Sequence, residues 1–274
     1  MSPTSRITPL SSLNLHSLSQ SFARLDHYFQ ARFRNRFGPV CRQLARFIHP
    51  GGTVLDIGAN HGKFAKNFAQ ACDGNCTVLC FEPLEYNYTL LERVVGRHKN
   101  VRILRTALAD HVGTADFYIP VRPSKRISPG AAHMGDEKNA DTFGTSTART
   151  VAKTTVPLDT LDNIIEREAA AHPALHVDLV KIDVQGAEPL VIAGGSKTLA
   201  AHKPAIWCEL CQGSTGPLGL TVHDSISRLA ALGYEMFTLN IATGAITPTE
   251  FTPAIRDYLF IHPNARPRQP APTA

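Results

Sequence analysis

Along most of the chain, short runs of apolar residues alternate with segments in which apolar residues recur every three or four positions. Short apolar runs are typical of buried strands, and the wider spacing is typical of amphipathic helices. The predicted strands are Thr53–Ile57, Thr77–Phe81, Val101–Leu104, Ala115–Ile119, Thr154–Val156, Val177–Ile182, Ala205–Leu210, Tyr234–Leu239 and Tyr258–Ile261. The predicted helices are Gly62–Cys72, Leu84–His98, Leu158–Ala170, Leu190–Ala200 and Val222–Leu232. This alternation predicts an α/β fold with a mostly parallel sheet, helices on both faces and an antiparallel edge at the last strands.

The first 49 residues have a different pattern. Residues 1–20 are Ser-rich and polar, which predicts a flexible N-terminal tail. In residues 21–49 the spacing is helical, arginines fall between the apolar positions, and Gly38-Pro39 predicts a break into two helices. Two interpretations of this basic amphipathic extension stay open. It packs on the domain or on a second subunit, as in a homodimer, or residues 22–48 make peripheral contact with a membrane or an acidic substrate.

Two further segments lack periodicity. Residues 120–150 are rich in Gly, Pro, Ser and Thr, and a loop of this length inside a domain is expected to act as a lid or to bind substrate. Residues 263–274 are Pro-rich and predict a disordered tail. A single domain over residues 50–262 is therefore expected, with extensions at both ends.

Charge and cysteine content restrict the partners and the compartment. Residues 1–50 contain seven arginines and one acid, Asp26, so most of the net charge of +5 lies in the extension. The body has no basic surplus, which makes nucleic acid an improbable partner. No stretch has the about 20 apolar residues that span a bilayer, and no secretory signal is recognisable. We therefore expect a cytoplasmic protein with six reduced cysteines.

The strand Thr53–Ile57 leads directly into a glycine-rich turn, the usual position of a ligand site in a parallel sheet. Gly58 allows the backbone to approach a ligand closely, and Gly62 allows tight contact between helix and strand. Asp56 precedes the first glycine, where an acid repels phosphate but suits a ligand with an ammonium group. S-adenosyl-L-methionine carries such a group. The predicted contacts in this turn are Asp56, Gly58, Ala59, Asn60, His61 and Gly62.

The next two strand ends complete the predicted cofactor site. Glu82 ends the second strand, where an acid can accept hydrogen bonds from both ribose hydroxyls. Pro83 then begins the following helix. Thr106 and Ala107 follow the third strand and are expected to meet the edge of the adenine ring. An acid in each of two successive strand ends indicates an adenosyl cofactor much more strongly than the glycine turn alone.

A second motif begins with Lys181 and Asp183, which share a face at the end of a buried strand. Asp183 is the leading candidate for a general base, and Lys181 could orient a hydroxyl or act as a base itself. Glu209, at the end of the next strand, is a third catalytic candidate, while Glu188, His61 and His133 are alternatives. A purely structural role for Lys181 and Asp183 also stays open. The spacing of these residues does not require a metal ion.

With these motifs in order, the chain resembles the FkbM family of methyltransferases. The matching pieces are Leu55–Gly62, Phe81-Glu82-Pro83, Thr160-Leu161-Asp162, Lys181–Glu188, Gly194-Gly195 and Pro204–Glu209. The resemblance implies a class I methyltransferase fold, which is Rossmann-like with a seven-stranded sheet, and S-adenosyl-L-methionine as cofactor. It also implies O-methylation of a small molecule, a sugar or a glycolipid. The family usually has Glu where this chain has Gln185, a loss of charge that is expected to alter a hydrogen bond near the site.

Two other functions remain as alternatives: RNA ribose 2′-O-methylation, and a cofactor-binding scaffold without catalysis. The arginine-rich extension favours RNA, but the absence of a basic strip interleaved with aromatic residues argues against it. Salt-dependent polyanion binding would distinguish the first alternative, and cofactor binding without turnover would distinguish the second.

Overall fold

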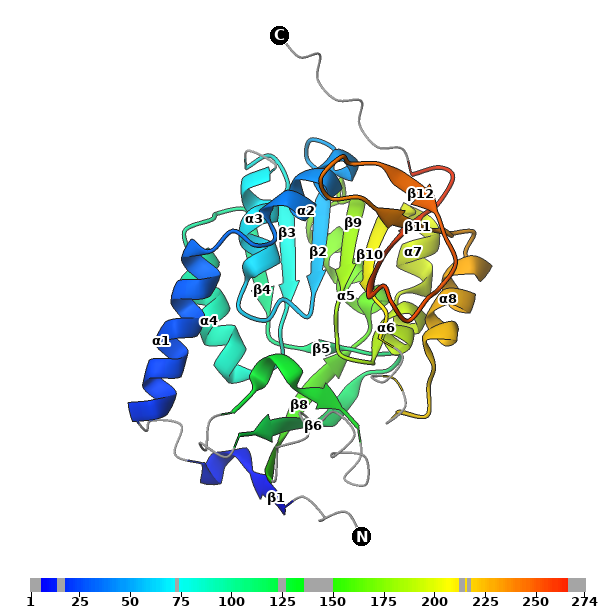
Figure 1. Ribbon diagram of the computed structural model, residues 1–274. Coiled ribbons are helices and arrows are strands. Elements are labelled where there is room, and N and C mark those ends of the chain that lie inside the picture. Colours follow the sequence, from blue (N-terminus) through cyan, green and yellow to red (C-terminus); the bar gives the residue numbers. More distant parts are fainter. Residues whose placement is uncertain are drawn as a thin grey trace.

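The computed structural model describes residues 6–13, 18–71, 74–122, 127–135, 150–211, 215 and 218–265. It contains a central sheet with helices on both faces and a smaller sheet that lies below the central one in the view of Figure 1. Ligand sites of parallel sheets lie at the carboxyl ends of the strands, and the cavity described below opens there.

The central sheet has the order β12-β11-β13-β10-β9-β2-β3-β4. Its strands are β2 (Thr53–Ile57), β3 (Thr77–Phe81), β4 (Val101–Leu104), β9 (Val177–Ile182), β10 (Ala205–Glu209), β11 (Glu235–Leu239), β12 (Ile246–Pro248) and β13 (Asp257–Ile261). The pairs from β4 to β10 are parallel, whereas β13 pairs antiparallel with β10 and β11. The predicted α/β fold with an antiparallel edge is confirmed, and the short strand β12 is an addition to the seven expected strands.

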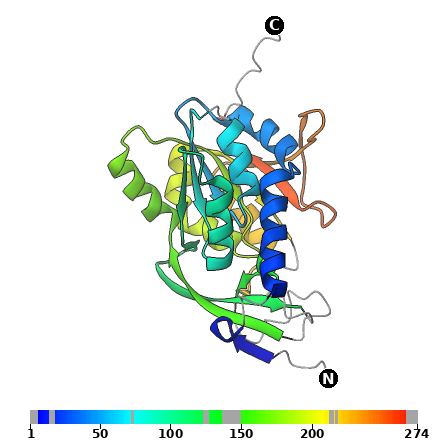
Figure 2. The same ribbon diagram turned by 90° about the vertical axis from the view of Figure 1, so that its left-hand side faces the viewer.

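Alternate residues of the central strands enter separate cores on the two faces, as the pleat of a strand requires. On β2, Leu55 packs into the core beneath α5, α6 and α8, while Val54 packs into the core beneath α2, α3 and α4. Figure 2 shows α1 and α5 on opposite sides of the sheet. The helices are α1 (Leu18–Phe33), α2 (Gly38–Leu44), α3 (Lys63–Ala71), α4 (Glu85–Val95), α5 (Leu161–Ala171), α6 (Glu188–Gly194), α7 (Ser196–His202) and α8 (Val222–Ala231).

The second sheet overturns part of the predicted loop over residues 120–150. Strand β6 (Gly113–Val121) pairs antiparallel along its whole length with β8 (Thr150–Asp159), and β7 (His133–Met134) pairs with β6. Since β8 continues to Asp159, the next helix begins only at Leu161, where Thr160 accepts a hydrogen bond from the Asn163 amide. Residues 123–126 and 136–149 of the expected lid lie outside the described residues.

The N-terminal extension contains the two predicted helices, α1 and α2, and Gly38-Pro39 begins the second of them. The expectation of a flexible tail over residues 1–20 is wrong for Arg6–Pro9, because these residues form β1, paired parallel with β8. Short 3-10 turns follow at Leu10–Ser12, Ala45–Phe47 and Pro129–Ala131, and β5 (Ala107–Leu108) also pairs with β8. Of the predicted C-terminal tail, residues 266–274 lie outside the described part.

The cysteines only partly match the prediction. Cys41, Cys80, Cys208 and Cys211 are free, whereas Cys76 is disulfide-bonded, so the expectation of six reduced cysteines is wrong. Within the described ranges, no helix is both long and apolar enough to cross a membrane.

Candidate functional site

A cavity of about 680 Å³ lies between the carboxyl ends of the central strands and the second sheet. Its walls come from the turns after β2, β3, β4 and β9, and from β6, β7 and the turn before β7. The lining residues are Ile57, Gly58, Asn60, Phe81, Glu82, Pro83, Leu84, Asn87, Thr106, Ala107, Leu108, Phe117, Pro129, Gly130, Ala132, Met134, Asp183, Val184, Gln185 and Ala187. The second sheet therefore covers the predicted cofactor site.

The turn after β2 is held close to the end of β9. Gly58 has φ of 75°, and a Cβ at this position would lie 2.0 Å from the carbonyl oxygen of Asp183. The amides of Gly58 and Ala59 both donate to the carbonyl of Phe81. Asn60 also adopts a left-handed conformation, with φ of 50°. These contacts leave the backbone of the turn facing the cavity, which only a glycine at position 58 permits.

Glu82 is buried at the end of β3 and lines the cavity. Its Oε2 accepts a hydrogen bond from the Asn60 amide at 2.9 Å. Its Oε1 accepts from the Leu84 amide at 3.0 Å and from the Asn87 side chain at 3.2 Å. Burial raises the pKa of Glu82 to about 7, although these three donors oppose the shift. The carboxylate is thus fixed in orientation, and with three of its about four acceptor positions occupied, Oε2 keeps one for a ligand hydroxyl.

The part of the cavity beyond Glu82 is mostly apolar. Thr106 and Ala107 line it, and the Thr106 hydroxyl donates to the carbonyl of Pro157 at 3.2 Å. Phe117 of β6 and Met134 of β7 add an aromatic ring and a thioether from the covering sheet. An apolar space beside a buried carboxylate suits an adenosine.

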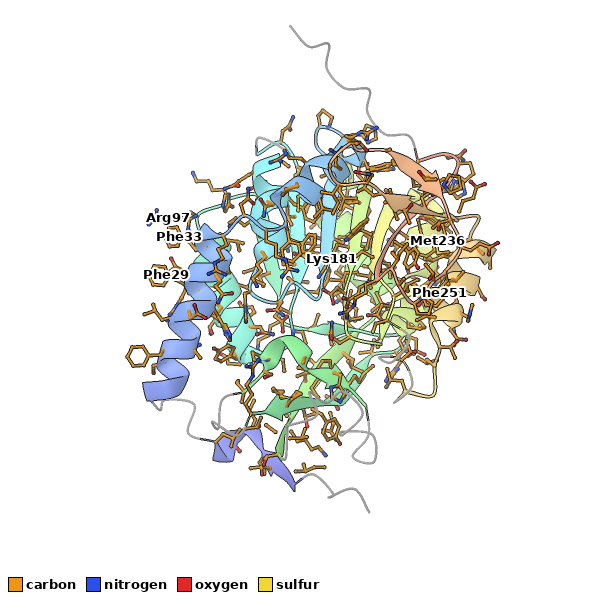
Figure 3. All side chains as sticks on the ribbon, in the orientation of Figure 1. Phe29, Phe33, Arg97, Lys181, Met236 and Phe251 are labelled. Atoms are coloured by element: carbon orange, nitrogen blue, oxygen red, sulfur yellow. The ribbon has the colours of Figure 1, made fainter. Side chains whose placement is uncertain are left out.

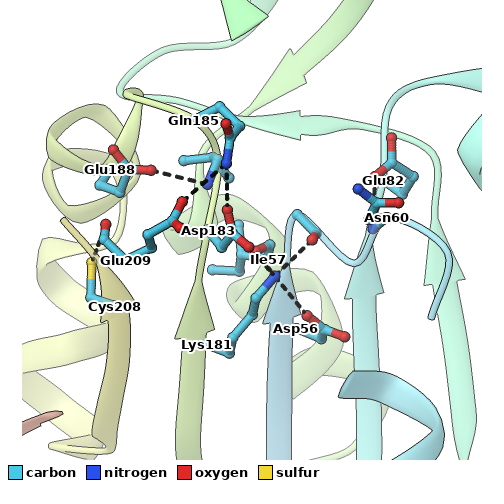
Figure 4. Close-up of polar contacts among 12 residues, drawn as sticks. Asp56, Ile57, Asn60, Glu82, Lys181, Asp183, Gln185, Glu188, Cys208 and Glu209 are labelled. Atoms are coloured by element: carbon cyan, nitrogen blue, oxygen red, sulfur yellow. Dashed lines mark hydrogen bonds and ion pairs between the residues drawn. The ribbon is translucent and has the colours of Figure 1, made fainter. Parts of the chain in front are cut away.

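Asp56 and Lys181 form a buried pair behind the cavity (Figure 4). Asp56 is 0% exposed, and its Oδ1 lies 3.3 Å from the Nζ of Lys181. Lys181 also donates to the carbonyls of Ile57 at 3.1 Å and Gly58 at 2.7 Å. Burial lowers the pKa of Lys181, but Asp56 and Asp183 outweigh it and raise that pKa overall. The ammonium group therefore stays charged and fixes the turn after β2, and neither side chain of the pair lines the cavity.

Asp183 lies on the cavity side of the same ammonium group. Its side chain is 37% exposed, and its Oδ2 lies 3.8 Å from the Nζ of Lys181. The Nε2 of Gln185 donates to Asp183 Oδ1 and to Glu209 Oε2, both at 3.0 Å. Burial and Asp183 raise the pKa of Glu209 to about 8, against the opposing charge of Arg256. Gln185 thus joins two carboxyl groups at the wall of the cavity (Figure 4).

The alternative bases have other positions. Glu188 is buried, and its Oε1 accepts from the amides of Val184 and Gly186, so it holds the turn after β9. His133 stacks on Tyr118 and does not line the cavity. His61 is buried outside the cavity, where it stacks on His27 with ring centroids 4.8 Å apart. Among the described residues, no cluster of three His, Cys, Asp or Glu side chains is arranged to hold a metal ion.

The cavity brings together part of the predicted set. The predicted cofactor residues that line it are Gly58, Asn60, Glu82, Pro83, Thr106 and Ala107. Those that do not line it are Asp56, Ala59, His61 and Gly62. Of the predicted catalytic residues, Asp183 lines it, while Lys181 and Glu209 lie behind it. Sequence reasoning missed the lining residues Asn87, Phe117, Pro129, Gly130, Ala132 and Met134, which belong to no recognisable motif.

Known proteins resemble this chain in sequence and in fold. The Methyltransferase FkbM domain matches residues 56–236. The chain is 30% identical over 172 residues to the 2-O-methyltransferase NoeI of Sinorhizobium fredii, an alignment that covers 58% of this chain and 64% of that protein. The crystal structure of the methyltransferase FkbM from Methylobacillus flagellatus is similar with a TM-score of 0.48 and 13% identity, over 77% of this chain and 44% of that chain. The O-methyltransferase TomG of Streptomyces achromogenes, solved with SAM, has a TM-score of 0.46 and 10% identity, over 87% of this chain and 89% of that one.

Proposed function

The chain belongs to the FkbM family of methyltransferases, and on this premise we propose that it transfers the methyl group of S-adenosyl-L-methionine to a hydroxyl oxygen of a small molecule, sugar or glycolipid. One observation carries the proposal: the Glu82 and Asp183 carboxylates line the same cavity. The first suits a ribose, and the second suits a hydroxyl that must lose its proton. The chain spans slightly less than two thirds of NoeI, whose name specifies 2-O-methylation, and we propose a broader class of acceptor accordingly.

The residues of the cavity fit the cofactor. Glu82 Oε2 would accept a hydrogen bond from a ribose hydroxyl, and Thr106, Ala107 and Phe117 would enclose the adenine. The turn at Gly58 and Asn60 would face the methionine part of the molecule. When bound, S-adenosylmethionine supplies a methyl group that its sulfonium already activates. The protein therefore has to orient the acceptor and remove one proton.

We assign proton removal to Asp183. Its Oδ1 accepts a hydrogen bond from the Gln185 amide. Its Oδ2 is 3.8 Å from the Nζ of Lys181, which is too far for a hydrogen bond. Oδ2 is therefore available to take the proton from the hydroxyl of the methyl acceptor. The Lys181 ammonium group lies near this carboxylate and places a positive charge beside it. Gln185 keeps the carboxylate in one orientation. Lys181 and Glu209 are positioning residues in this mechanism.

The cofactor assignment is tested by titrating the full chain with S-adenosylhomocysteine between pH 6 and pH 8.5. A ribose hydroxyl donates to an ionised Glu82, so affinity should rise with pH through about 7. Glu82→Gln should weaken binding about 10–100-fold at pH 8 and flatten the pH dependence, because a charge-assisted hydrogen bond is lost. Glu85→Gln, on the exposed side of the same helix start, is the matched control. Unchanged affinity in Glu82→Gln would refute the ribose assignment.

We also propose that α1 contacts an anionic membrane surface. Phe22, Leu25, Phe29 and Phe33 are 63%, 50%, 50% and 66% exposed on one face of this helix, and Figure 3 shows Phe29 and Phe33 projecting outward. Arginines flank this face, and Arg32 lies against the Phe33 ring, so the surface combines apolar and cationic groups. Phe29→Glu/Phe33→Glu should abolish sedimentation with phosphatidylglycerol vesicles. If the wild type does not bind these vesicles but dimerises through α1, the homodimer interpretation replaces that of membrane contact.

A further inference from the structure

A second hollow, the α1 groove, lies between α1, the turn after β2 and the segment that precedes β7. It is an open hollow of about 1420 Å³, a volume that includes space open to solvent. Asn60, Pro129 and Gly130 line both the α1 groove and the cofactor cavity, so these three residues form the boundary between the two. A molecule held in the α1 groove therefore lies directly beside the cavity that contains Asp183.

The α1 groove differs from the cavity in its chemistry. Lys63 and Arg122 bring positive charge to it, and the Nε of Arg122 donates to the Ser128 hydroxyl at 3.0 Å, which holds the guanidinium on this wall. Asp26 and Gln30 add a carboxylate and an amide from α1, bonded to each other at 2.7 Å. Mixed donors and acceptors of this kind suit a ligand with several hydroxyls. Two cations against one acid favour a ligand that also carries negative charge.

Two features of the wall indicate that it is prepared for a ligand. His61 is only 6% exposed, and no hydrogen bond to its Nε2 is described, although the ring lines the groove. Burial, His27 and Lys63 lower its pKa to about 3, so the ring is neutral and can exchange a hydrogen bond with a hydroxyl. Lys63 is subject to the positive charges of Arg36 and Arg34. Burial and these two charges lower the pKa of Lys63. The His61 pKa is also affected by a side-chain hydrogen bond with Asn87, so the clustered positive charge is the stronger of the two features, and an anionic group would relieve it.

We propose that the α1 groove binds the methyl acceptor, and that this acceptor is a polyhydroxylated molecule whose phosphate or carboxylate group lies against Lys63 and Arg122. The proposal rests on the methyl-transfer function proposed above, since it concerns the second substrate of that reaction. The hydroxyl end of the acceptor lies toward Asn60 and Gly130. These two residues also line the cavity that contains Asp183.

The test uses saturation-transfer NMR on the full chain saturated with S-adenosylhomocysteine. The probes are glucose 6-phosphate, glucuronate, glucose and inorganic phosphate. Glucose 6-phosphate or glucuronate should bind at least about tenfold more tightly than glucose, and the stronger of the two identifies the anionic group. Inorganic phosphate alone should bind more weakly than the sugar phosphate. Equal binding of glucose and its charged derivatives, or binding of none of the anionic sugars, would overturn the proposal.

Variants separate this proposal from the cofactor assignment. Lys63→Met and Arg122→Met should each weaken the anionic probe about tenfold or more and leave S-adenosylhomocysteine affinity unchanged. Arg228→Met, an exposed cation on α8, is the matched control and should change neither affinity. Wild-type probe affinity in both groove variants would refute the groove as the acceptor site. Failure to bind S-adenosylhomocysteine in the wild type would instead refute the proposed function.

Discussion

Asp56 and Asp183 flank the same ammonium group but lie in very different surroundings. Asp56, at 0% exposure, lies beneath the turn after β2 and pairs with Lys181 without reaching the cavity. Asp183, at 37% exposure, lines the cavity and is oriented by Gln185. We therefore expect a strand-end acid to act structurally or chemically according to its access to the cavity. Asp56 should matter for stability, and Asp183 should matter for turnover.

The largest effect is expected where the buried pair is broken. Lys181→Met leaves the Asp56 carboxyl buried without its cation, which should cost about 3–5 kcal/mol of unfolding free energy. Asp183→Asn, whose side chain is partly solvated, should cost less than about 1 kcal/mol. Urea unfolding of both variants makes the comparison directly. Similar stability losses in the two variants would mean that the distinction between the two acids is wrong.

A smaller effect is expected at Gln185. Its amide donates to both carboxyl groups at any pH, whereas Gln185→Glu can donate only while a proton remains in the cluster. The turnover of Gln185→Glu should therefore match that of the wild type near pH 6 and be about tenfold lower at pH 8. A tenfold fall corresponds to the loss of roughly one charge-assisted hydrogen bond. Gln185→Ala, which removes the donor without adding charge, is the control and should be impaired at both pH values. A pH-independent loss in Gln185→Glu would contradict the bridging role.

The sequence pattern predicted the central sheet because each strand is a short apolar run with strong periodicity around it. It also predicted Glu82 and Asp183, because a strand-end acid next to a helix start is visible in one dimension. Two strands of the second sheet were predicted, Ala115–Ile119 within β6 and Thr154–Val156 within β8, but their assembly into a separate sheet was not. β6 and β7 pair only through partners distant in the chain, and their contributions to the cavity, Phe117 and Met134, lie in no motif.

The roles of the predicted residues depended on three-dimensional detail. Asp56 was predicted to contact the cofactor, but the parallel register places it opposite Lys181, and the ion pair then holds both side chains beneath the turn. Gln185 was recognised only as a departure from the family pattern. Its bridge requires a left-handed backbone, with φ of 55°, and a partner on another strand, Glu209. Neither condition can be read from a linear spacing.

We propose that Asp183 removes the proton from the acceptor hydroxyl, whereas other residues of the cavity bind the cofactor. This proposal is tested most directly by comparing the wild type with Asp183→Asn for transfer of a labelled methyl group into a cell extract, with S-adenosylhomocysteine affinity measured on the same preparations. We expect equal cofactor affinity and a fall in turnover of about 10²–10⁴-fold, the usual contribution of a general base. Turnover that survives in Asp183→Asn would contradict it.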